Sequence, residues 1–483
     1  MKKVISSLLV MSMMLYASVA KADNLTVEQA KTIGCYYMAS QTGYSKLAPE
    51  HLTLIYQFEN LELGIPSAYV FNVNSCGWII IAASSVVDPI IAFSTESTLD
   101  MSDIPDNMRW WLNGYTDVIA SVQVLDAEKD YPDSQEYTQL VKEGKNGTKD
   151  QQVVLMTTTW DQGTTRNPTY NYYCPKVGNR YSVTGCVATA LAQICKYYEY
   201  PVQPKGTKTY NWNGTTLSIS YDTVQFDYSL MPKYLKSNTP QEQKLEVAKL
   251  NYCLGVAVEM DYSPDGSAAY MQDASEAMRF RFKYQRNTVT YRRGSGTDTS
   301  FVNTLRRYLL NNDVVAMGGS SSQGSGADAA GHAWVACGYM EQNTKMYYMN
   351  WGWASVGDGF YNLADNNMYI SEQGYNFNLG QSCLFGMIPP EDSNIRHNPV
   401  AIREVDNNTI LGSAYPNPAT MSVSLPYSTN EVADMQVFSI DGKLISSQRV
   451  QPGNGEISLR VDALPKGVYI YRMNSKSGKF IVQ

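Results

Sequence analysis

The 483-residue sequence lacks several features that mark large classes of protein. It has no long basic run and a formal net charge of -7, which excludes the electrostatic pattern of a nucleic-acid-binding protein. Beyond the N-terminus no apolar run reaches the roughly 20 residues that span a bilayer, so we expect no transmembrane segment in the mature protein. The eight cysteines include no C-x-x-C pair, so we expect no zinc site, no other metal and no cofactor.

The N-terminus is typical of a secretory signal peptide. Lys2 and Lys3 precede an apolar stretch from residue 4 to 15, and small residues follow up to Ala22. We expect cleavage after Ala22 or Ala20. The alternative is a membrane anchor, which the shortness of the apolar stretch disfavours. Export permits disulfides, but an exported cysteine enzyme must keep one thiol free.

The residue patterns along the rest of the chain predict an α+β protein of several domains. A first region of strand-like segments is followed by a Trp-rich helical stretch at 108–119, and a polar linker of the kind that proteases cut spans 141–150. A long mixed domain follows, and short alternating segments near the C-terminus predict a small β-sandwich. The expected boundaries are 1–22 for the signal peptide, 23–152 for the first domain with its linker, 153–390 for the long domain, 391–408 for a connector and 409–483 for the sandwich.

A helix that begins near Cys186 carries the first chemical signal. Apolar residues from Val187 to Tyr198 recur at offsets typical of one buried helix face, and Thr184 is a suitable N-cap. Cys186 would then lie in the first turn, where free backbone N–H groups favour a thiolate and can face an oxyanion. The alternative is a small apolar residue that simply packs at a helix start.

Histidine is scarce, which makes the search for a base short. The chain has His51, His332 and His397, and only His332 shares the long domain with Cys186. His332 begins an alternating segment that predicts a strand. A lone histidine with a purely structural role is the alternative.

A second strand, 346–353, follows a polar turn at 341–345 and predicts a hairpin with the His332 strand. The hairpin would bring Asn350, Trp351 and Trp353 beside residues 332–336, with a register uncertain by a residue or two. An amide or indole there can orient an imidazole, and the tryptophans can exclude water. The tryptophans can equally be ordinary core aromatics.

Three motifs, in this order and spacing, resemble the streptopain-like cysteine peptidases, which are relatives of papain, and among them the interpain-type enzymes of Bacteroidetes. They are Thr184-Gly185-Cys186-Val187-Ala188-Thr189-Ala190, Gly331-His332-Ala333-Trp334-Val335 and Asn350-Trp351-Gly352-Trp353. The first domain also resembles the inhibitory prodomain of that family, from Phe71 to Ser94. Two departures follow the motifs, Ala336-Cys337 where Cys-Asp is usual and Ala354-Ser355-Val356 where Gly is usual.

The resemblance implies a papain-like cysteine endopeptidase made as a zymogen. Cys186 would be the nucleophile and His332 the base and later the acid. Gln162 and the Cys186 backbone N–H would form the oxyanion hole, and Asn350 or a neighbouring tryptophan would support the imidazole. The partners implied are protein or peptide substrates and the chain's own prodomain as inhibitor.

The C-terminal unit resembles the sorting domain of the type IX secretion system of Bacteroidetes. The resemblance rests on Tyr415-Pro416-Asn417-Pro418-Ala419, Asp441-Gly442-Lys443, Leu464-Pro465-Lys466-Gly467-Val468-Tyr469-Ile470-Tyr471 and the final Phe480-Ile481-Val482-Gln483. It implies a secreted or cell-surface protein that engages the type IX machinery. An accessory sandwich that binds carbohydrate or protein is the alternative.

Two other functions remain open at this point. The same thiolate can transfer an acyl group to another acceptor, as in transpeptidation or deamidation. A retained fold can also serve as a non-catalytic surface binder, although the retention of both Cys186 and His332 argues against this.

Overall fold

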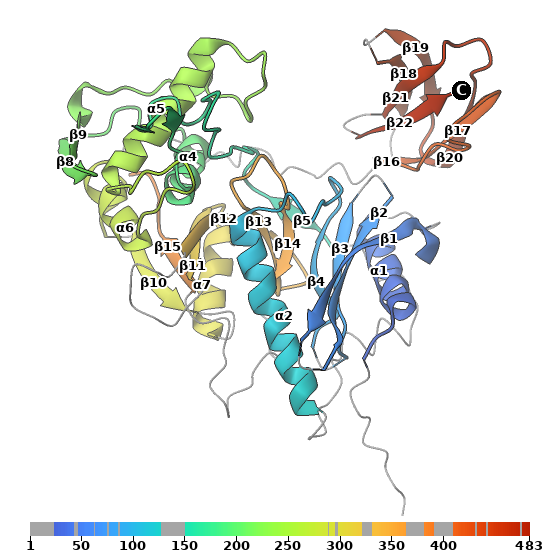
Figure 1. Cartoon of the computed structure of the whole chain (residues 1–483), viewed down its shortest axis with the longest axis horizontal. Helices are drawn as coiled ribbons and strands as arrows, with labels where there is room; N and C mark the ends of the chain where they lie inside the picture. Colours follow the sequence, from blue (N-terminus) through green and yellow to red (C-terminus); the bar gives the residue numbers. More distant parts are fainter. Residues whose placement is uncertain are drawn as a thin grey trace, which may run out of the picture.

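A computed structural model of the chain shows two layered domains that share one sheet and a separate C-terminal sandwich (Figure 1). The signal peptide predicted at 1–22, the linker at 141–149, the connector at 391–408 and His397 lie outside the described residues. The structure describes residues 24–42, 47–61, 63–74, 77–85, 87–126, 150–287, 289–294, 298–320, 331–363, 381–390, 409–429, 432–440, 443–473 and 476–483.

The central sheet runs without a break from the N-terminal domain into the long domain. Its strand order is β1-β2-β3-β4-β14-β13-β12-β11-β15-β10, and β5 also pairs with β12. The junction is the antiparallel pair β4 and β14, in which Phe360 lies opposite Phe93 and Tyr361 opposite Ala92. The strands are β1 (Leu52–Asn60), β2 (Ile65–Val73), β3 (Trp78–Ala82), β4 (Ile90–Ser94), β5 (Gln152–Val154), β10 (Thr290–Gly294), β11 (Val315–Ser320), β12 (Gly331–Met340), β13 (Met346–Asn350), β14 (Gly359–Asn362) and β15 (Gln381–Phe385).

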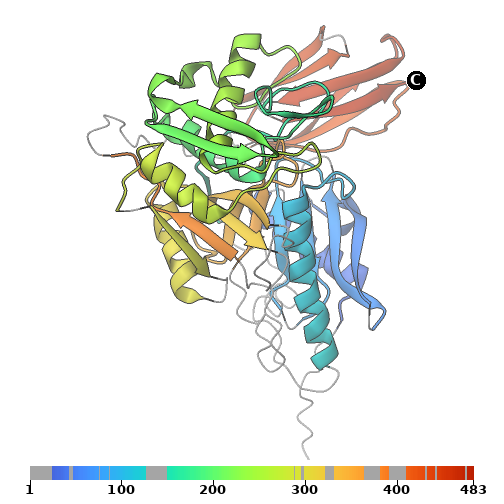
Figure 2. The ribbon, with the colours of Figure 1, turned by 60° about the vertical axis from the view of Figure 1, so that its left-hand side comes forward.

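Helices cover both faces of the N-terminal part of this sheet (Figures 1 and 2). Helix α1 (Val27–Thr42) packs on β3, where Gly34 approaches Ile79 and Ile81. Helix α2 (Asp106–Asp126) lies on the opposite face. Trp78 precedes Ile79 on β3, so its side chain points to that face. Every residue of β3 is therefore buried.

The expected strands followed by a helix are confirmed as β1 to β4 and α2, whereas α1, which precedes them, was not predicted. Thr26 and Gln29 form a reciprocal cap at its start, in which each side-chain oxygen accepts the other residue's backbone N–H, at 3.3 and 2.8 Å. The Thr-x-x-Gln spacing was a readable signal for this helix. The second helix, α2, confirms the helical stretch expected at 108–119.

In the long domain, the helix that begins at Cys186 lies between the sheet and a second helix. Helix α4 (Cys186–Tyr198) packs between β12 and α5 (Gln241–Ala257), and the hairpin β8 (Thr207–Trp212) and β9 (Thr215–Ser220) lies against α5. The remaining elements are α6 (Met271–Phe280), α7 (Thr299–Leu310), β6 (Lys176–Val177), β7 (Arg180–Tyr181) and the short 3-10 helices η1 (Pro49–His51), η2 (Tyr221–Thr223) and η3 (Tyr228–Leu230).

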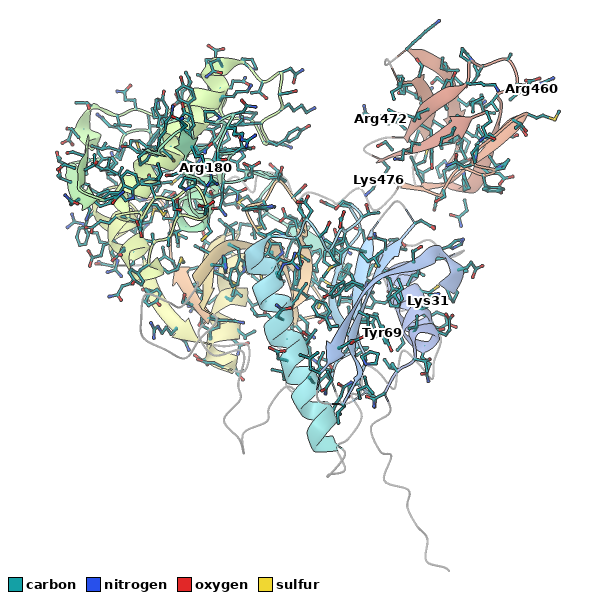
Figure 3. The ribbon with its side chains drawn as sticks, viewed as in Figure 1. Lys31, Tyr69, Arg180, Arg460, Arg472 and Lys476 are labelled. Carbon is teal, nitrogen blue, oxygen red and sulfur yellow. The ribbon has the colours of Figure 1, made fainter. Side chains whose placement is uncertain are left out.

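The C-terminal β-sandwich is confirmed. A three-stranded sheet and a four-stranded sheet enclose a separate apolar core that includes Val423, Tyr471 and Phe480. Lys476, labelled in Figure 3, donates a 3.2 Å hydrogen bond to the Thr95 carbonyl of the N-terminal domain. The strands are β16 (Thr409–Leu411), β17 (Ser422–Thr429), β18 (Ala433–Ser439), β19 (Leu444–Val450), β20 (Gly453–Arg460), β21 (Gly467–Met473) and β22 (Lys476–Val482).

Within the described ranges, no helix is both long enough and apolar enough to cross a membrane. Cysteines 35, 174, 186, 195, 253, 337 and 383 are buried free thiols, and Cys76 lies outside the description.

Candidate active site

The helix that begins at Cys186 starts differently from the prediction. The N-cap is Gly185, with φ 85° and ψ 142°, and not Thr184. The Thr184 hydroxyl instead pairs with the Thr189 hydroxyl at 2.7 Å, inside the domain. A side chain at Gly185 would meet the Met260 sulfur at 2.6 Å, so both the backbone angle and the space require glycine. Cys186 is therefore fixed at the first helical position.

Cys186 is buried, with 9% exposure. Burial raises the pKa of its thiol, whereas hydrogen bonds from the backbone N–H groups of Ala333, Val187 and Cys186 itself lower it. The net shift is upward, so the acidic thiol expected from the helix start is wrong for this state of the protein. The Ala333 contact places the sulfur directly beside the residue that follows His332.

His332 lies on β12 and is partly buried. It pairs across the sheet with Gly319 on β11. On the other side, β12 and β13 form the predicted hairpin, with Val335 opposite Asn350. The hairpin prediction is confirmed, and it brings Asn350 to within one strand of the His332 segment. His51 by contrast has a local role, because its Nδ1 accepts the Ala48 N–H at 3.0 Å.

Gln162 is held near Cys186 through its backbone. Its carbonyl accepts the Thr184 N–H at 3.0 Å, two residues before Cys186. The neighbouring Asp161 carboxylate accepts the Gly163 N–H at 2.6 Å, which closes a turn around Gln162. Gly163 has φ 83°, and a Cβ there would lie 2.1 Å from Asn171 Oδ1. The loop that carries Gln162 therefore has a fixed backbone.

Asn350 is buried and its amide makes three hydrogen bonds. Its Nδ2 donates to the Thr158 carbonyl at 2.7 Å, and its Oδ1 accepts from Gly352 N–H and from Gln193 Nε2, both at 3.0 Å. Gln193 lies on α4, the helix that starts at Cys186. Asn350 thus ties β13 to that helix and to the segment that leads to Gln162.

The two tryptophans that follow Asn350 occupy different environments. Trp351 is 1% exposed, and its ring lies 5.1 Å from that of Trp334, centroid to centroid. Trp353 is 36% exposed. After it, Ala354 and Ser355 adopt positive φ angles of 51° and 69°, so the residues that depart from the family pattern lie where glycine costs less.

The N-terminal domain contacts the long domain close to the hairpin turn. Asp88 is buried and forms an ion pair with Lys345, and Asn362 Nδ2 lies 3.4 Å from the same carboxylate oxygen. Phe93 stacks on Phe360, with centroids 5.4 Å apart. The two domains are therefore joined by a sheet, an aromatic stack and a buried charge.

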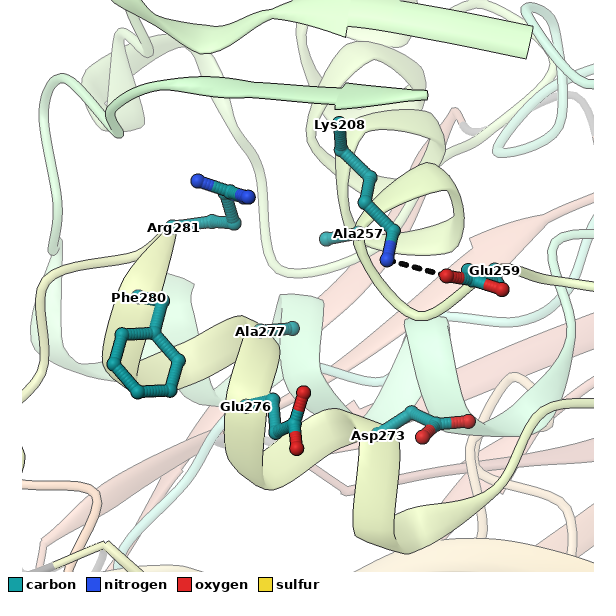
Figure 4. A pocket seen from close by; sticks show the side chains of 8 residues that line it. All are labelled: Lys208, Ala257, Glu259, Asp273, Glu276, Ala277, Phe280 and Arg281. Atoms are coloured by element: carbon teal, nitrogen blue, oxygen red, sulfur yellow. Dashed lines mark hydrogen bonds and ion pairs between the residues drawn. The ribbon is translucent and has the colours of Figure 1, made fainter. Parts of the chain in front are cut away.

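A cavity of about 160 Å³ lies elsewhere in the long domain, between β8, α5 and α6 (Figure 4). Lys208 and Glu259 form an ion pair at its wall, and burial and the nearby Glu259 and Glu276 raise the pKa of Asp273. None of the predicted catalytic residues lines it. Across the described residues, no group of three or more His, Cys, Asp or Glu side chains is arranged to hold a metal ion.

The sequence reasoning missed Gln193. It is a fully buried amide in an otherwise largely apolar helix. An amide among apolar residues of the predicted helix was a readable signal, because a buried amide requires hydrogen-bond partners.

Comparisons with known proteins agree with the three-part organisation. Residues 160–361 match the peptidase C10 family, residues 22–119 the Spi protease inhibitor and residues 413–483 the secretion system C-terminal sorting domain. Streptopain of Streptococcus pyogenes serotype M1 is 27% identical over an alignment of 352 residues that covers 68% of this chain and 82% of streptopain. Thiol protease/hemagglutinin PrtT of Porphyromonas gingivalis is 25% identical over 310 residues, 61% of this chain but 33% of that protein.

A solved structure is similar to the larger part of the chain. A fragment of prointerpain A from Prevotella intermedia superposes with a TM-score of 0.55 at 25% identity. The match covers 70% of this chain and 99% of that fragment.

Proposed function

Because this chain is a secreted cysteine protease zymogen of the streptopain family (peptidase C10), we propose that Cys186 is its nucleophile and His332 its general base. The observation that carries the proposal is the hydrogen bond from the Ala333 N–H to the Cys186 sulfur. It supports a thiol and an imidazole on facing elements, a helix start and a strand. Such a pair is the minimum for thiol-based acyl transfer.

The reaction begins when His332 takes the Cys186 proton and the thiolate attacks the substrate carbonyl carbon. The carbonyl oxygen becomes an oxyanion, which the Cys186 backbone N–H and the Gln162 side-chain amide stabilise. The C–N bond then breaks as His332 returns the proton to the leaving amine, and a thioester on Cys186 remains. His332 next removes a proton from water, whose oxygen attacks the thioester, and the acid product and the free thiol are released.

The support for the imidazole comes from three candidates. Asn350 is the last residue of β13, the strand that pairs with the His332 strand, and Trp351 and Trp353 follow it. The hydrogen bonds of the Asn350 amide go to Thr158, Gln193 and Gly352, which favours a part in holding the backbone. Trp351 and Trp334 would shield the site from water.

The N-terminal domain keeps the enzyme latent until the linker is cut. We propose that cleavage falls near residues 142–152, and the contacts of Asp150 and β5 narrow this range. Asp150 accepts N–H groups from Gln342 and Asn343, and β5 pairs with β12. A cut after Asp150 would remove the two Asp150 hydrogen bonds from the mature enzyme, and a cut within β5 would also remove part of its pairing with β12, so cleavage falls before Asp150.

The domains and their partners follow from this scheme. The first domain acts as the inhibitor. The peptidase takes in Asp150 and β5 and extends to residue 390, so it starts a few residues before the boundary of 153 expected from the sequence. The sandwich at 409–483 is the signal for export, and its partner is the type IX secretion machinery.

The test compares four variants of the purified full-length precursor. With Cys186→Ala or His332→Ala, the precursor should not process itself. After an added serine protease has cut the linker, these variants should still show no peptidase activity. Cys195→Ala removes another buried thiol of the same helix and should retain activity. His51→Ala is the matched histidine control. A Cys186→Ala precursor that matures alone as the wild type does would refute self-processing.

The acyl acceptor is tested separately. Mass spectrometry of products from a mixed peptide library should show new termini created by hydrolysis. Ligated peptides, or glutamine converted to glutamate without new termini, would indicate transpeptidation or deamidation.

A further inference from the structure

We propose that Gln193 is a positioning residue that sets the distance between the nucleophile and the oxyanion hole. This inference rests on the proposed roles of Cys186 and Gln162. Gln193 follows Cys186 by seven positions on α4, so both lie on nearly the same helix face. Its side chain is 0% exposed.

Gln193 uses both ends of its amide to join separate segments. Its Oε1 accepts the Trp160 N–H at 3.2 Å, and its Nε2 donates to Asn350 Oδ1 at 3.0 Å. Asn350 in turn donates to the Thr158 carbonyl at 2.7 Å. These bonds close a ring through the 158–160 backbone and two buried amides.

The ring fixes the chain immediately before Gln162. Trp160 is two residues upstream of Gln162, and the Gln162 carbonyl accepts the Thr184 N–H at the other end of the segment. The Trp160–Gln193 hydrogen bond attaches this segment to the middle of α4, and the Gln162–Thr184 hydrogen bond attaches it to the chain just before Cys186. One anchor lies within α4 and the other two residues before its first residue, and together they define the position of Gln162 relative to the thiol.

The same ring reaches the proposed imidazole support. Asn350 lies opposite Val335, which is on β12, the strand that carries His332. A Cβ at Gly352 would lie 3.3 Å from Thr189 Cγ2 and 3.9 Å from Gln193 Nε2, so the chain after Asn350 rests on this face of α4. Gln193 therefore meets both halves of the catalytic arrangement without touching the reacting atoms.

The chemistry of an amide explains why glutamine serves here. The buried Trp160 N–H requires an acceptor and the Asn350 oxygen a donor, and one amide supplies both without charge. Methionine has a similar length but offers neither. Glutamate has a similar shape, and it can donate to Asn350 only while its carboxyl is protonated.

The experiment measures peptide hydrolysis by Gln193→Met and Gln193→Glu enzymes, matured from full-length precursor by an added serine protease that is then inhibited. We expect Gln193→Met to lower kcat by about 10- to 100-fold, the scale of a misplaced oxyanion donor, with a much smaller change in KM. The loss in Gln193→Met should be independent of pH. In Gln193→Glu the loss should grow as pH rises and the buried carboxyl ionises.

Alkylation by iodoacetamide separates positioning from folding. In that reaction the Cys186 sulfur displaces iodide from a CH₂ group and no oxyanion forms, so both variants should alkylate at the wild-type rate. Asn251→Leu removes another fully buried amide, on α5, and should lower stability but not kcat. The double variant Gln193→Met and Gln162→Ala should have a kcat little lower than the worse of the two single variants, because both substitutions act on one interaction.

Several outcomes overturn the inference. One is a kcat of Gln193→Met within about twofold of wild type, and another is an equal fall in its rates of alkylation and hydrolysis. The others are a fall in the kcat of Gln193→Glu that does not change with pH, and an equal fall in the kcat of Asn251→Leu. Failure of the proposed function looks different, because Cys186→Ala enzyme would then still hydrolyse peptides whatever Gln193 does.

Discussion

The buried ion pair between Asp88 and Lys345 offers a direct test of how the prodomain is held. Asp88 belongs to the prodomain and its side chain is 3% exposed, whereas Lys345 lies in the β12–β13 turn with a side chain 33% exposed. Lys345→Met removes the ammonium that pairs with the buried Asp88 carboxylate, whose Oδ2 also lies 3.4 Å from the Asn362 amide nitrogen.

The cost lies between two limits. Removing one partner of a fully buried pair costs about 3–5 kcal/mol, and an exposed pair contributes about 1 kcal/mol or less. Because water reaches one of the two partners here, we expect about 2 kcal/mol, which is roughly a 30-fold weaker hold on the prodomain.

The assay uses full-length precursor that carries Cys186→Ala and is cut in the linker by added mature enzyme. The fraction of prodomain that stays bound is measured by size-exclusion chromatography over a dilution series. Lys208→Met is the matched control, because Lys208 pairs with Glu259 inside the catalytic domain. Asp88→Asn together with Lys345→Met should recover part of the loss. Binding within about twofold of wild type in Lys345→Met would refute the reasoning.

Three further predictions concern single positions. Burial and the nearby Glu96 raise the pKa of Asp358 to about 8. The folded precursor therefore holds this proton more tightly than the unfolded chain and loses stability as pH rises from about 4 to 8, by up to about 1.4 kcal/mol per pH unit. Asp358→Asn should flatten this part of the pH dependence in thermal melts, and an unchanged slope would contradict the raised pKa of Asp358. Gly185→Ala should lower kcat by about 100-fold, because the new Cβ meets the Met260 sulfur and displaces the start of α4; wild-type kinetics would show that the position tolerates a side chain. Asp150→Ala leaves two backbone N–H groups of the hairpin turn without their acceptor and should lower the free energy of unfolding of the mature enzyme by about 1–3 kcal/mol in urea titrations, a result that an unchanged midpoint would exclude.

Much of the site was predictable because the relevant signals are local. The apolar period after Cys186 predicted α4, and the rarity of histidine singled out His332. The turn at 341–345 predicted the hairpin, and its register places Asn350 opposite Val335.

Other features depend on contacts that the sequence does not display. Thr184 has the right chemistry for an N-cap, but the positive φ of Gly185 gives that place to glycine. Burial, which decides the direction of the Cys186 pKa, arises from tertiary packing. The pairing of β4 with β14 joins strands from two domains, and no local pattern specifies such a partner.

The central claim is that a thioester forms on Cys186. Mature enzyme mixed with a slowly hydrolysed peptide ester should be quenched in acid, digested and analysed by mass spectrometry. The account predicts the acyl mass on the peptide that contains Cys186, and its absence in Cys186→Ala. An acyl group on another residue, or steady hydrolysis by the Cys186→Ala enzyme, would contradict it.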